Sequence, residues 1–206
     1  MNRIFLHFHR LSRLKKYRLF MQKLQPAPEM RILNVGAIGH HIGLAEQLEE
    51  FYPQRKRIVG GSLLWEDVAD YARSYPEAKA LLFDACALPF PDQSFDIVYS
   101  NAVIEHLPSW EAQRLFAAQI MRVGRGWFVA TPNFWYPLEP HYHLPYVQLL
   151  PEVWQQHLAR ALGHKPYPYL RPLGTRDLRR LFPCGETMSC RVTFWPETLI
   201  SFRRPS

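Results

Sequence analysis

Residues 83–96 read FDACALPFPDQSFD and connect two short apolar runs, Ala80–Phe83 and Phe95–Ser100. Each run has the length and the apolar content of a buried strand. The connecting segment carries proline, aspartate and serine, which favour turns over helix. The sequence therefore predicts two strands joined by an irregular loop.

Outward from this pair, short apolar runs alternate with longer amphipathic stretches. Further strands are predicted at Met30–Val35, at Arg57–Val59 with Gly60, and at Trp127–Thr131. Helices are predicted near His41–Phe51, at about Leu64–Ser74 and at Trp110–Met121. Strands that alternate with helices indicate a mainly parallel sheet covered on both faces, which is an α/β fold.

The segment Pro132–Pro172 breaks this alternation, because it is rich in Pro, Tyr, His and Trp and holds one predicted helix, at about Pro151–Leu162. Beyond it we expect a short helix, Thr175–Leu181, with Thr175 as its N-cap. Two final strands are predicted, at Thr187–Phe194 and Glu197–Arg203. We interpret residues 29–206 as a single domain with a lid or insertion at about 132–172.

Residues 1–28 form a separate basic segment. Of the 25 Lys and Arg residues in the chain, seven lie within residues 1–23, where no Asp or Glu occurs. The other 18 are balanced by the 18 acidic residues, so the net charge of +7 belongs to this segment. A formally neutral body does not favour nucleic acid as a partner, and modification of nucleic acid guided by the basic segment is the weakest alternative.

Apolar residues of this segment recur every three or four positions and predict an amphipathic helix, which Pro26 and Pro28 end. The apolar positions are Ile4, Phe8, Leu11, Leu14, Tyr17, Met21 and Leu24. Two roles fit the pattern. The helix packs its apolar stripe on the domain and exposes its charges, or it lies on an anionic membrane surface.

The composition also limits the location of the protein. The cysteines Cys86, Cys184 and Cys190 have no paired spacing, and no apolar run is long enough to cross a bilayer. The N-terminal segment lacks the uninterrupted apolar core of a signal peptide. We therefore expect a protein of the reducing cytoplasm, with peripheral membrane contact through residues 1–24 as a further expectation.

Four stretches, in this order, resemble class I S-adenosyl-L-methionine (SAM)-dependent methyltransferases of the branch that modifies small molecules and lipids. They are ILNVG at 32–36, FDA at 83–85 with LPFPDQSFD at 88–96, EHL at 105–107 and TPN at 131–133. The resemblance implies a Rossmann-like fold with a mainly parallel seven-stranded sheet, helices on both faces and an antiparallel last strand. It also implies SAM as the cofactor and methyl transfer as the reaction.

By this resemblance the cofactor lies beyond the carboxyl ends of the strands, where open α/β sheets bind ligands. Gly36 lets the backbone approach the cofactor closely. Asp84 accepts a hydrogen bond from the adenine amino group, with the Ala85 N–H nearby; a turn or cap is the alternative role of Asp84. The other positions assigned to the cofactor are Asn34, Ala37, Ser62, Asn101 and Ala102, the last two on its methionine side.

Two features depart from the family pattern. The first glycine-rich loop has Asn34 where an acidic residue is typical, and Ile38 and His40 where glycines are typical. After the second strand, Ser62 stands where a carboxylate normally binds the ribose, and Glu66 lies one helical turn further on. Two functions therefore stay open: an active methyltransferase, and a methyltransferase-like protein that has lost catalysis and acts as a binding or regulatory partner.

Methyl transfer to an oxygen or carbon acceptor benefits from a general base, for which His106, His141 and His143 are candidates. His141 and His143 share one face if their segment is extended. No metal is expected, because no further ligand joins Glu139 and these histidines at a defined spacing. The aromatic residues nearby fit a flat or apolar acceptor, so we expect a small-molecule, lipid or saccharide acceptor.

Overall fold

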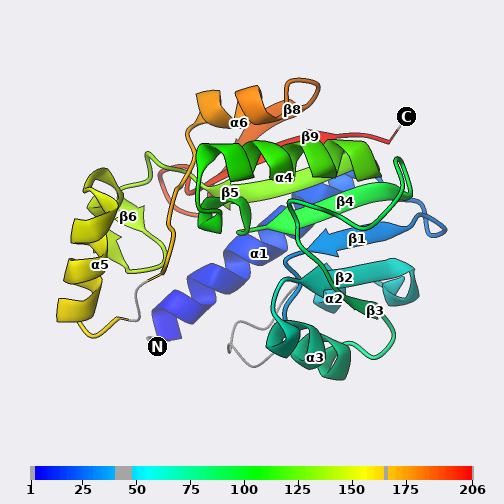
Figure 1. Ribbon diagram of the computed structural model, residues 1–206, viewed down its shortest axis with the longest axis horizontal. Coiled ribbons are helices and arrows are strands. Elements are labelled where there is room, and N and C mark those ends of the chain that lie inside the picture. The colour runs from blue at the N-terminus through cyan, green and yellow to red at the C-terminus, as the bar shows by residue number, and fades with distance from the viewer. Residues whose placement is uncertain (1–2, 40–47, 165–166, 206) are drawn as a thin grey trace.

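The computed structural model describes residues 3–39, 48–164 and 167–205. Its centre is a seven-stranded sheet in the order β3-β2-β1-β4-β5-β9-β8 (Figure 1). The strands are β1 (Ile32–Val35), β2 (Ile58–Ser62), β3 (Lys79–Leu82), β4 (Phe95–Asn101), β5 (Gly124–Pro132), β8 (Glu186–Cys190) and β9 (Thr198–Arg203). The pairs formed among β1–β5 are all parallel, whereas β9 is antiparallel to both β5 and β8. The predicted fold class is confirmed.

Helices cover both faces of this sheet (Figure 1). One face carries α1 (Arg3–Leu24), α2 (Leu48–Phe51) and α3 (Trp65–Ser74), and the other carries α4 (Trp110–Val123) and α6 (Thr175–Leu181). Beyond the sheet, α5 (Glu152–Ala161) packs with the small hairpin of β6 (Leu138–Glu139) and β7 (Leu144–Pro145). Three short 3-10 helices connect these elements: η1 (Arg55–Arg57), η2 (Ile104–His106) and η3 (Val147–Leu149).

The first helix is part of the core of the domain. Phe20 is fully buried, and its ring meets those of Tyr99 and Phe128 edge to face, with centroids 5.4 and 5.7 Å apart. Edge-to-face aromatic packing stabilises such contacts beyond the burial of area alone. The helix ends at Leu24, close to the predicted end at Pro26.

The buried side of α1 differs from the predicted stripe. Among the side chains of α1 that the structure describes, the buried ones are Lys16, Phe20 and Leu24, at steps of four, whereas Phe8 and Leu11 are exposed. The predicted position Ile4 lies outside the described side chains. The helix crosses the sheet obliquely, and its N-terminal half projects past the strand ends towards α5 (Figure 1). Only the C-terminal half therefore has a sheet surface on which to bury apolar side chains.

The proline-rich loop between β3 and β4 is held in place by α4. The Arg122 guanidinium donates to the carbonyl oxygens of Leu88 (3.0 Å) and Phe90 (2.7 Å) and to the carboxylate of Asp92 (2.8 Å). The Phe90 ring packs against that of Phe95, with centroids 5.0 Å apart. The LPFPDQSFD stretch is thus held in shape by contacts among its own side chains and by hydrogen bonds from Arg122.

Two boundary predictions are wrong. The strand predicted to reach Phe194 ends at Cys190, and residues 191–197 form bends closed by a hydrogen bond from Val192 N–H to the Glu197 carboxylate (2.7 Å). The N-cap of α6 is Gly174 rather than Thr175, and the Asp177 carboxylate accepts the Gly174 N–H at 3.1 Å. Of the helix predicted near His41–Phe51, residues 41–47 lie outside the described residues.

The turn after β1 requires glycine for two reasons. Gly36 has φ +80°, and a Cβ there would lie 2.2 Å from Cγ2 of Val103. Gly163 has a similar φ of +76°, but a Cβ there meets nothing within 4 Å. Substitutions at these two glycines therefore distinguish the cost of backbone strain from the cost of a steric collision.

We expect Gly163→Ala to lower the free energy of unfolding by about 1 kcal/mol, the cost of placing a Cβ at positive φ. Gly36→Ala should cost about 2 kcal/mol more, because it also forces Val103 out of place. Urea unfolding monitored by circular dichroism measures both values. Equal losses in the two variants would show that the contact with Val103 is not tight.

Candidate functional site

Parallel strands bring their carboxyl ends to one edge of the sheet, and four predicted cofactor positions follow those ends. Gly36 follows β1, Ser62 ends β2, Asp84 follows β3 and Asn101 ends β4. Such an edge, where the strand order reverses between β1 and β4, is the usual ligand site of open α/β sheets. The sheet therefore gathers these residues as the sequence analysis expected.

The turn at Gly36 is hydrogen-bonded to the neighbouring strand β2 at this edge. The N–H groups of Gly36 and Ala37 both donate to the carbonyl oxygen of Gly61, at 2.8 and 3.1 Å. The Ala37 side chain is fully buried in the core on the α1 face. Ala37 therefore offers no side chain to the edge, and the backbone of Gly36 and Ala37 joins the turn after β1 to the end of β2.

A buried carboxylate lies beside Asn34, the residue that replaces the family's usual acid. Asn34 donates from Nδ2 to Oε1 of Glu49 at 2.8 Å, and the Tyr71 hydroxyl donates to the same oxygen at 2.7 Å. Burial raises the pKa of Glu49, although these two hydrogen bonds oppose the shift. Glu49, on α2, thus supplies an acid at this end of β1, and sequence spacing gave no indication of it.

A second carboxylate appears at the predicted ribose position. Ser62 donates from Oγ to Oδ2 of Asp67 at 3.0 Å, in the first turn of α3. Glu66, the residue considered from the sequence, is exposed and belongs to the same turn. The carboxylate that is hydrogen-bonded to Ser62 is therefore that of Asp67 and not that of Glu66, and Asp67 was not predicted from the sequence.

Asp84 has features of both roles considered for it. Its Oδ1 accepts the N–H of Cys86 at 2.8 Å, which is a local turn contact, and the side chain is exposed. Ala85 is half-buried and packs against the core of the α4 face. The carboxylate thus stands in a fixed orientation at the end of β3 while remaining accessible.

On the methionine side, the structure adds a residue from the N-terminal helix. Lys16 is only 8 % exposed and donates from Nζ to Oδ1 of Asn101 at 2.7 Å. Burial lowers the pKa of Lys16 from 10.5 to about 8. The groups that act on this pKa, on α1 and on elements around it, are Arg13, Cys190, Glu105 and Glu197. Next to Asn101, Ala102 takes a left-handed conformation (φ +59°), strain of the kind that concentrates at functional sites.

These residues fit the polar groups of SAM. Asp84 offers an acceptor for the adenine amino group, the Ser62–Asp67 pair offers partners for ribose hydroxyls, and the Lys16 ammonium offers a partner for the methionine carboxylate. A buried lysine with a lowered pKa and few fixed partners is suited to binding an anion. Asp84, the Ser62–Asp67 pair and Lys16 therefore offer polar partners to three parts of the cofactor, in a chain that has Ile38 and His40 where the family typically has glycines.

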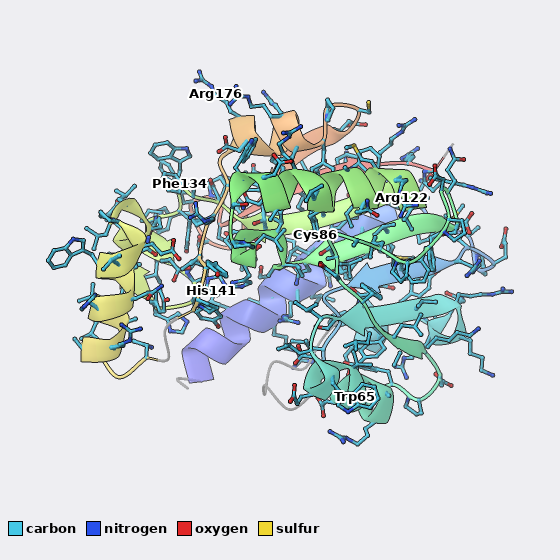
Figure 2. The ribbon with its side chains drawn as sticks, viewed as in Figure 1. Trp65, Cys86, Arg122, Phe134, His141 and Arg176 are labelled. Atoms are coloured by element: carbon cyan, nitrogen blue, oxygen red, sulfur yellow. The ribbon has the colours of Figure 1, made fainter. Side chains whose placement is uncertain are left out.

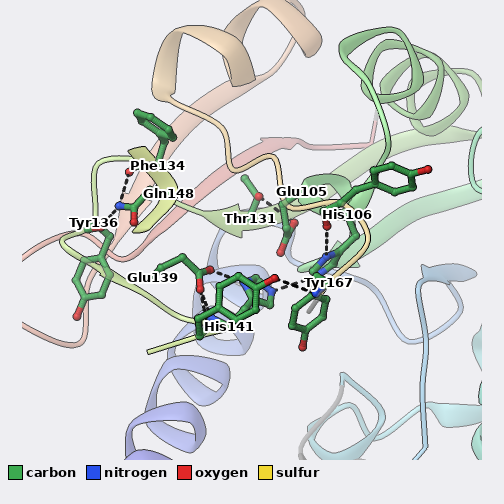
Figure 3. A network of polar contacts seen from close by, with 11 residues as sticks. Glu105, His106, Thr131, Phe134, Tyr136, Glu139, His141, Gln148 and Tyr167 are labelled. Atoms are coloured by element: carbon green, nitrogen blue, oxygen red, sulfur yellow. Dashed lines mark hydrogen bonds and ion pairs between the residues drawn. The ribbon is translucent and has the colours of Figure 1, made fainter. Parts of the chain in front are cut away.

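A chain of polar side chains lies next to this edge (Figure 3). His106, at the end of η2, and His141, in the turn between β6 and β7, face each other with their Nε2 atoms 3.1 Å apart. The Glu139 carboxylate lies 2.6 Å from Nδ1 of His141 and also accepts the N–H groups of His141 and Tyr142. Figure 2 shows His141 at the end of the sheet from which α5 projects.

The pKa values of the two histidines are shifted in opposite directions. Burial lowers the pKa of both rings, but the hydrogen bond and charge of Glu139 outweigh it at His141, whose pKa is raised. At His106 burial prevails and the pKa is lowered. The Tyr169 carbonyl lies 3.4 Å from Nδ1 of His106, and the Tyr167 ring stacks on the imidazole with centroids 5.0 Å apart.

His143 is not part of the Glu139–His141–His106 chain, and the condition under which it would share a face with His141, an extended segment, is not met. Residues 140–143 form the turn of the β6–β7 hairpin, in which His143 N–H donates to the Glu139 carbonyl and φ of His143 is +56°. Because the Glu139 carboxylate caps this turn, His141 and His143 do not share a strand face. Burial lowers the pKa of His143, which is half-buried.

Glu105 completes the neighbourhood of the histidines. It is fully buried, and its Oε2 accepts a hydrogen bond from the Thr131 hydroxyl at 3.0 Å. Its Oε1 is buried without a hydrogen-bond partner among the described residues. One ligand atom from each of Glu105, His106 and His141 lies within 4.8 Å of the others.

A parallel sheet in this order, with polar side chains gathered at its carboxyl edge, defines the doubly wound α/β class that binds nucleotide-like ligands there. Residues 41–129 match the family described as a methyltransferase domain. No curated protein matches the chain significantly. The domain match and the fold support a SAM-dependent methyltransferase of class I, with SAM as its cofactor.

Solved structures share this fold at low sequence identity. The PH0226 protein of Pyrococcus horikoshii OT3 superposes with a TM-score of 0.62 at 13 % identity, over 96 % of this chain and 91 % of its own. A SAM-dependent methyltransferase from Methanosarcina mazei gives 0.56 at 12 % identity, over 86 % and 92 %. The YcgJ protein of Bacillus subtilis gives 0.57 at 20 % identity, over 85 % and 70 %.

We expect Lys16→Gln to weaken binding of S-adenosylhomocysteine about tenfold, because it removes a charged partner of the cofactor's carboxylate. Wild-type affinity should also fall as the pH rises through about 8, where Lys16 loses its proton. Calorimetric titrations at several pH values measure both effects, with Lys15→Gln on the exposed side of the helix as the control. An identical pH profile in the Lys16→Gln protein would contradict this role.

Proposed function

We propose that this protein transfers the methyl group of SAM to an oxygen or carbon atom of a small-molecule, lipid or saccharide acceptor. The observation that carries the proposal is the Glu139–His141–His106 chain. This chain lies beside the carboxyl edge, as the contacts of the neighbouring Glu105 indicate. Glu105 accepts a hydrogen bond from Thr131, near the end of β5, and acts electrostatically on Lys16. An acceptor there lies close to both the histidines and the cofactor positions.

In this mechanism SAM supplies an electrophilic methyl group on a sulfonium, and the residues of the chain hold cofactor and acceptor in line. Asp84, the Ser62–Asp67 pair and Lys16 bind the ends of the cofactor. His106 and His141 contact the acceptor, and an imidazole nitrogen accepts the proton that leaves its hydroxyl or acidic carbon. Glu139 fixes the orientation of the His141 ring.

The segment after β5 favours an apolar acceptor. Its aromatic side chains include exposed Trp135 and Tyr146, next to buried Tyr142. The Gln148 amide donates to the carbonyl oxygens of Phe134 and Tyr136 at 3.1 and 2.7 Å, which gives the segment a fixed shape. A shaped, aromatic cover of this kind suits a flat or lipid-like molecule.

Calorimetric titration with SAM and with S-adenosylhomocysteine tests cofactor binding. We expect micromolar affinity, and a loss of about tenfold or more in Asp84→Asn, because an amide nitrogen faces the adenine amino group where an acceptor is needed. Asp92→Asn, in the same loop but bonded to Arg122, is the control and should bind normally. Unchanged affinity in Asp84→Asn would overturn the adenine assignment.

The same proteins distinguish an active methyltransferase from an inactive binding or regulatory protein. With tritiated SAM and an organic lipid extract, an active enzyme transfers label to the organic-soluble fraction, and His106→Gln should abolish transfer while keeping cofactor affinity. Tight binding of S-adenosylhomocysteine without transfer to any acceptor fraction would favour a binding or regulatory protein.

We also propose peripheral contact with an anionic membrane, because α5 has its apolar side outward. Trp154 is 66 % exposed, whereas Gln155 beside it is 5 % exposed and donates to the Leu150 carbonyl. Four exposed apolar residues are spaced four positions apart, Leu150, Trp154, Leu158 and Leu162, and Leu149 and Val153 are exposed beside them. The helix α1 is basic along its length, and its N-terminal half projects towards α5 (Figure 1). None of the described helices is long and apolar enough to cross a bilayer.

The membrane proposal predicts that Trp154→Ser with Leu158→Ser lowers partitioning onto vesicles of phosphatidylcholine and phosphatidylglycerol by about tenfold or more, since two apolar side chains no longer insert. Arg10→Gln with Arg18→Gln should lower it on these vesicles only, and not on neutral ones. Phe194→Ser, which removes an exposed side chain elsewhere, is the control. Equal sedimentation of all variants with vesicles would refute the proposal.

A further inference from the structure

We propose that Glu105, His106 and His141 form a binding site for a divalent transition-metal ion. The sequence analysis expected no metal, and the set it considered joined Glu139 to His141 and His143. The structure brings a different set together: two neighbours in η2 and one residue of the β6–β7 turn, 35 positions away (Figure 3). Their ligand atoms all lie within 4.8 Å of one another.

The spacing of the two imidazoles fits a shared ion. Zn–N bonds of about 2.0–2.1 Å in a tetrahedral site place two ligand nitrogens about 3.3 Å apart. The Nε2 atoms of His106 and His141 are 3.1 Å apart. An ion can therefore bind both nitrogens after a small movement of the rings, with the Glu105 carboxylate as the third ligand.

Each proposed ligand is already oriented by a partner on its other polar atom. Nδ1 of His141 lies 2.6 Å from the Glu139 carboxylate, and Nδ1 of His106 lies 3.4 Å from the Tyr169 carbonyl. The Thr131 hydroxyl donates to Oε2 of Glu105. Metal-binding histidines are typically held by a carboxylate or a carbonyl in this way, which leaves the outer nitrogen for the ion. Glu139 is therefore an orienting residue, and not a ligand.

The Glu105 carboxylate provides an independent observation. The side chain is fully buried, and Oε1 has no hydrogen-bond partner among the residues that the structure describes. A buried carboxylate oxygen without a partner is costly. An ion between this oxygen and the two imidazoles supplies the missing partner.

The charges and ligand types narrow the choice of ion. Glu105 and Glu139 are buried acids at the cluster, and Lys16 is the cation that acts on Glu105. Two imidazoles and one carboxylate suit first-row divalent ions such as Zn²⁺ better than Mg²⁺ or Ca²⁺, which prefer oxygen ligands. Three protein ligands leave a coordination position for water or an acceptor oxygen. An imidazole nitrogen that binds the ion cannot accept a proton, so the role of base proposed for His106 and His141 belongs to the metal-free protein.

Calorimetric titration of chelator-treated full-length protein with ZnCl₂ tests this site. We expect one equivalent bound, with affinity lowered about 100-fold or more in His106→Gln and in His141→Gln, because each removes one of three ligands. Glu139→Gln should weaken binding about 10- to 100-fold through the orientation of His141. His143→Gln and His157→Gln, histidines outside the cluster, should bind Zn²⁺ like the wild type. Co²⁺ absorption in the visible range reports the same site spectroscopically.

Each variant is also titrated with S-adenosylhomocysteine, which shows that it is folded and keeps this test separate from the proposed methyl transfer. Zinc binding with the expected losses supports the site whatever the acceptor or the activity proves to be. Equal zinc affinity in the wild type, His106→Gln and His141→Gln proteins would show binding elsewhere and overturn the inference. No zinc binding at micromolar concentrations would overturn it too.

Discussion

The parallel pairing of β1 with β2 and β4 is the constraint on which the site depends. Its register sets Val35 opposite both Gly61 and Ser100, so three chain segments leave the sheet at one level. The Ser100 hydroxyl donates to the Val35 carbonyl at 3.0 Å, and Gly36 N–H donates to Gly61. The polar groups at the strand ends, such as those of Ser62 and Asn101, take their position from this alignment, because parallel strands bring their carboxyl ends to one edge of the sheet.

The sheet was predictable because its central strands are buried on both faces and read as apolar runs. The placement of candidate residues at the carboxyl edge was predictable only where a residue lies at or just beyond the end of a strand, as Asn101 and Asp84 do. Glu49 and Asp67 were missed because they reach the edge from helices, and Lys16 because its helix precedes the sheet altogether. Their contacts depend on how helices cross the sheet, which single-sequence periodicity does not encode.

The β6–β7 turn at residues 140–143 is a second feature that the sequence pattern does not reveal. Alternating residues imply a common face only in a strand. Here the Glu139 carboxylate accepts two successive N–H groups, those of His141 and Tyr142, and so stabilises a turn where the pattern suggested extended chain. That turn directs His141 towards His106 and leaves His143 outside the chain of contacts.

The buried charged residues help to decide whether a chain with a degenerate glycine loop has lost catalysis. Among the described residues, the buried members of Asp, Glu, Lys and Arg are Lys16, Glu49, Glu105 and Glu139. Each is costly to bury, and none is needed for a stable core of this size. All four lie at the carboxyl edge or on the lid segment beside it. A fold retained only for binding through its surface has no use for buried Lys16, Glu105 and Glu139, whereas the proposed site for a charged cofactor and a reacting acceptor uses these three. Glu49 is instead paired with Asn34 and Tyr71. The arrangement therefore favours an active enzyme over an inactive relative.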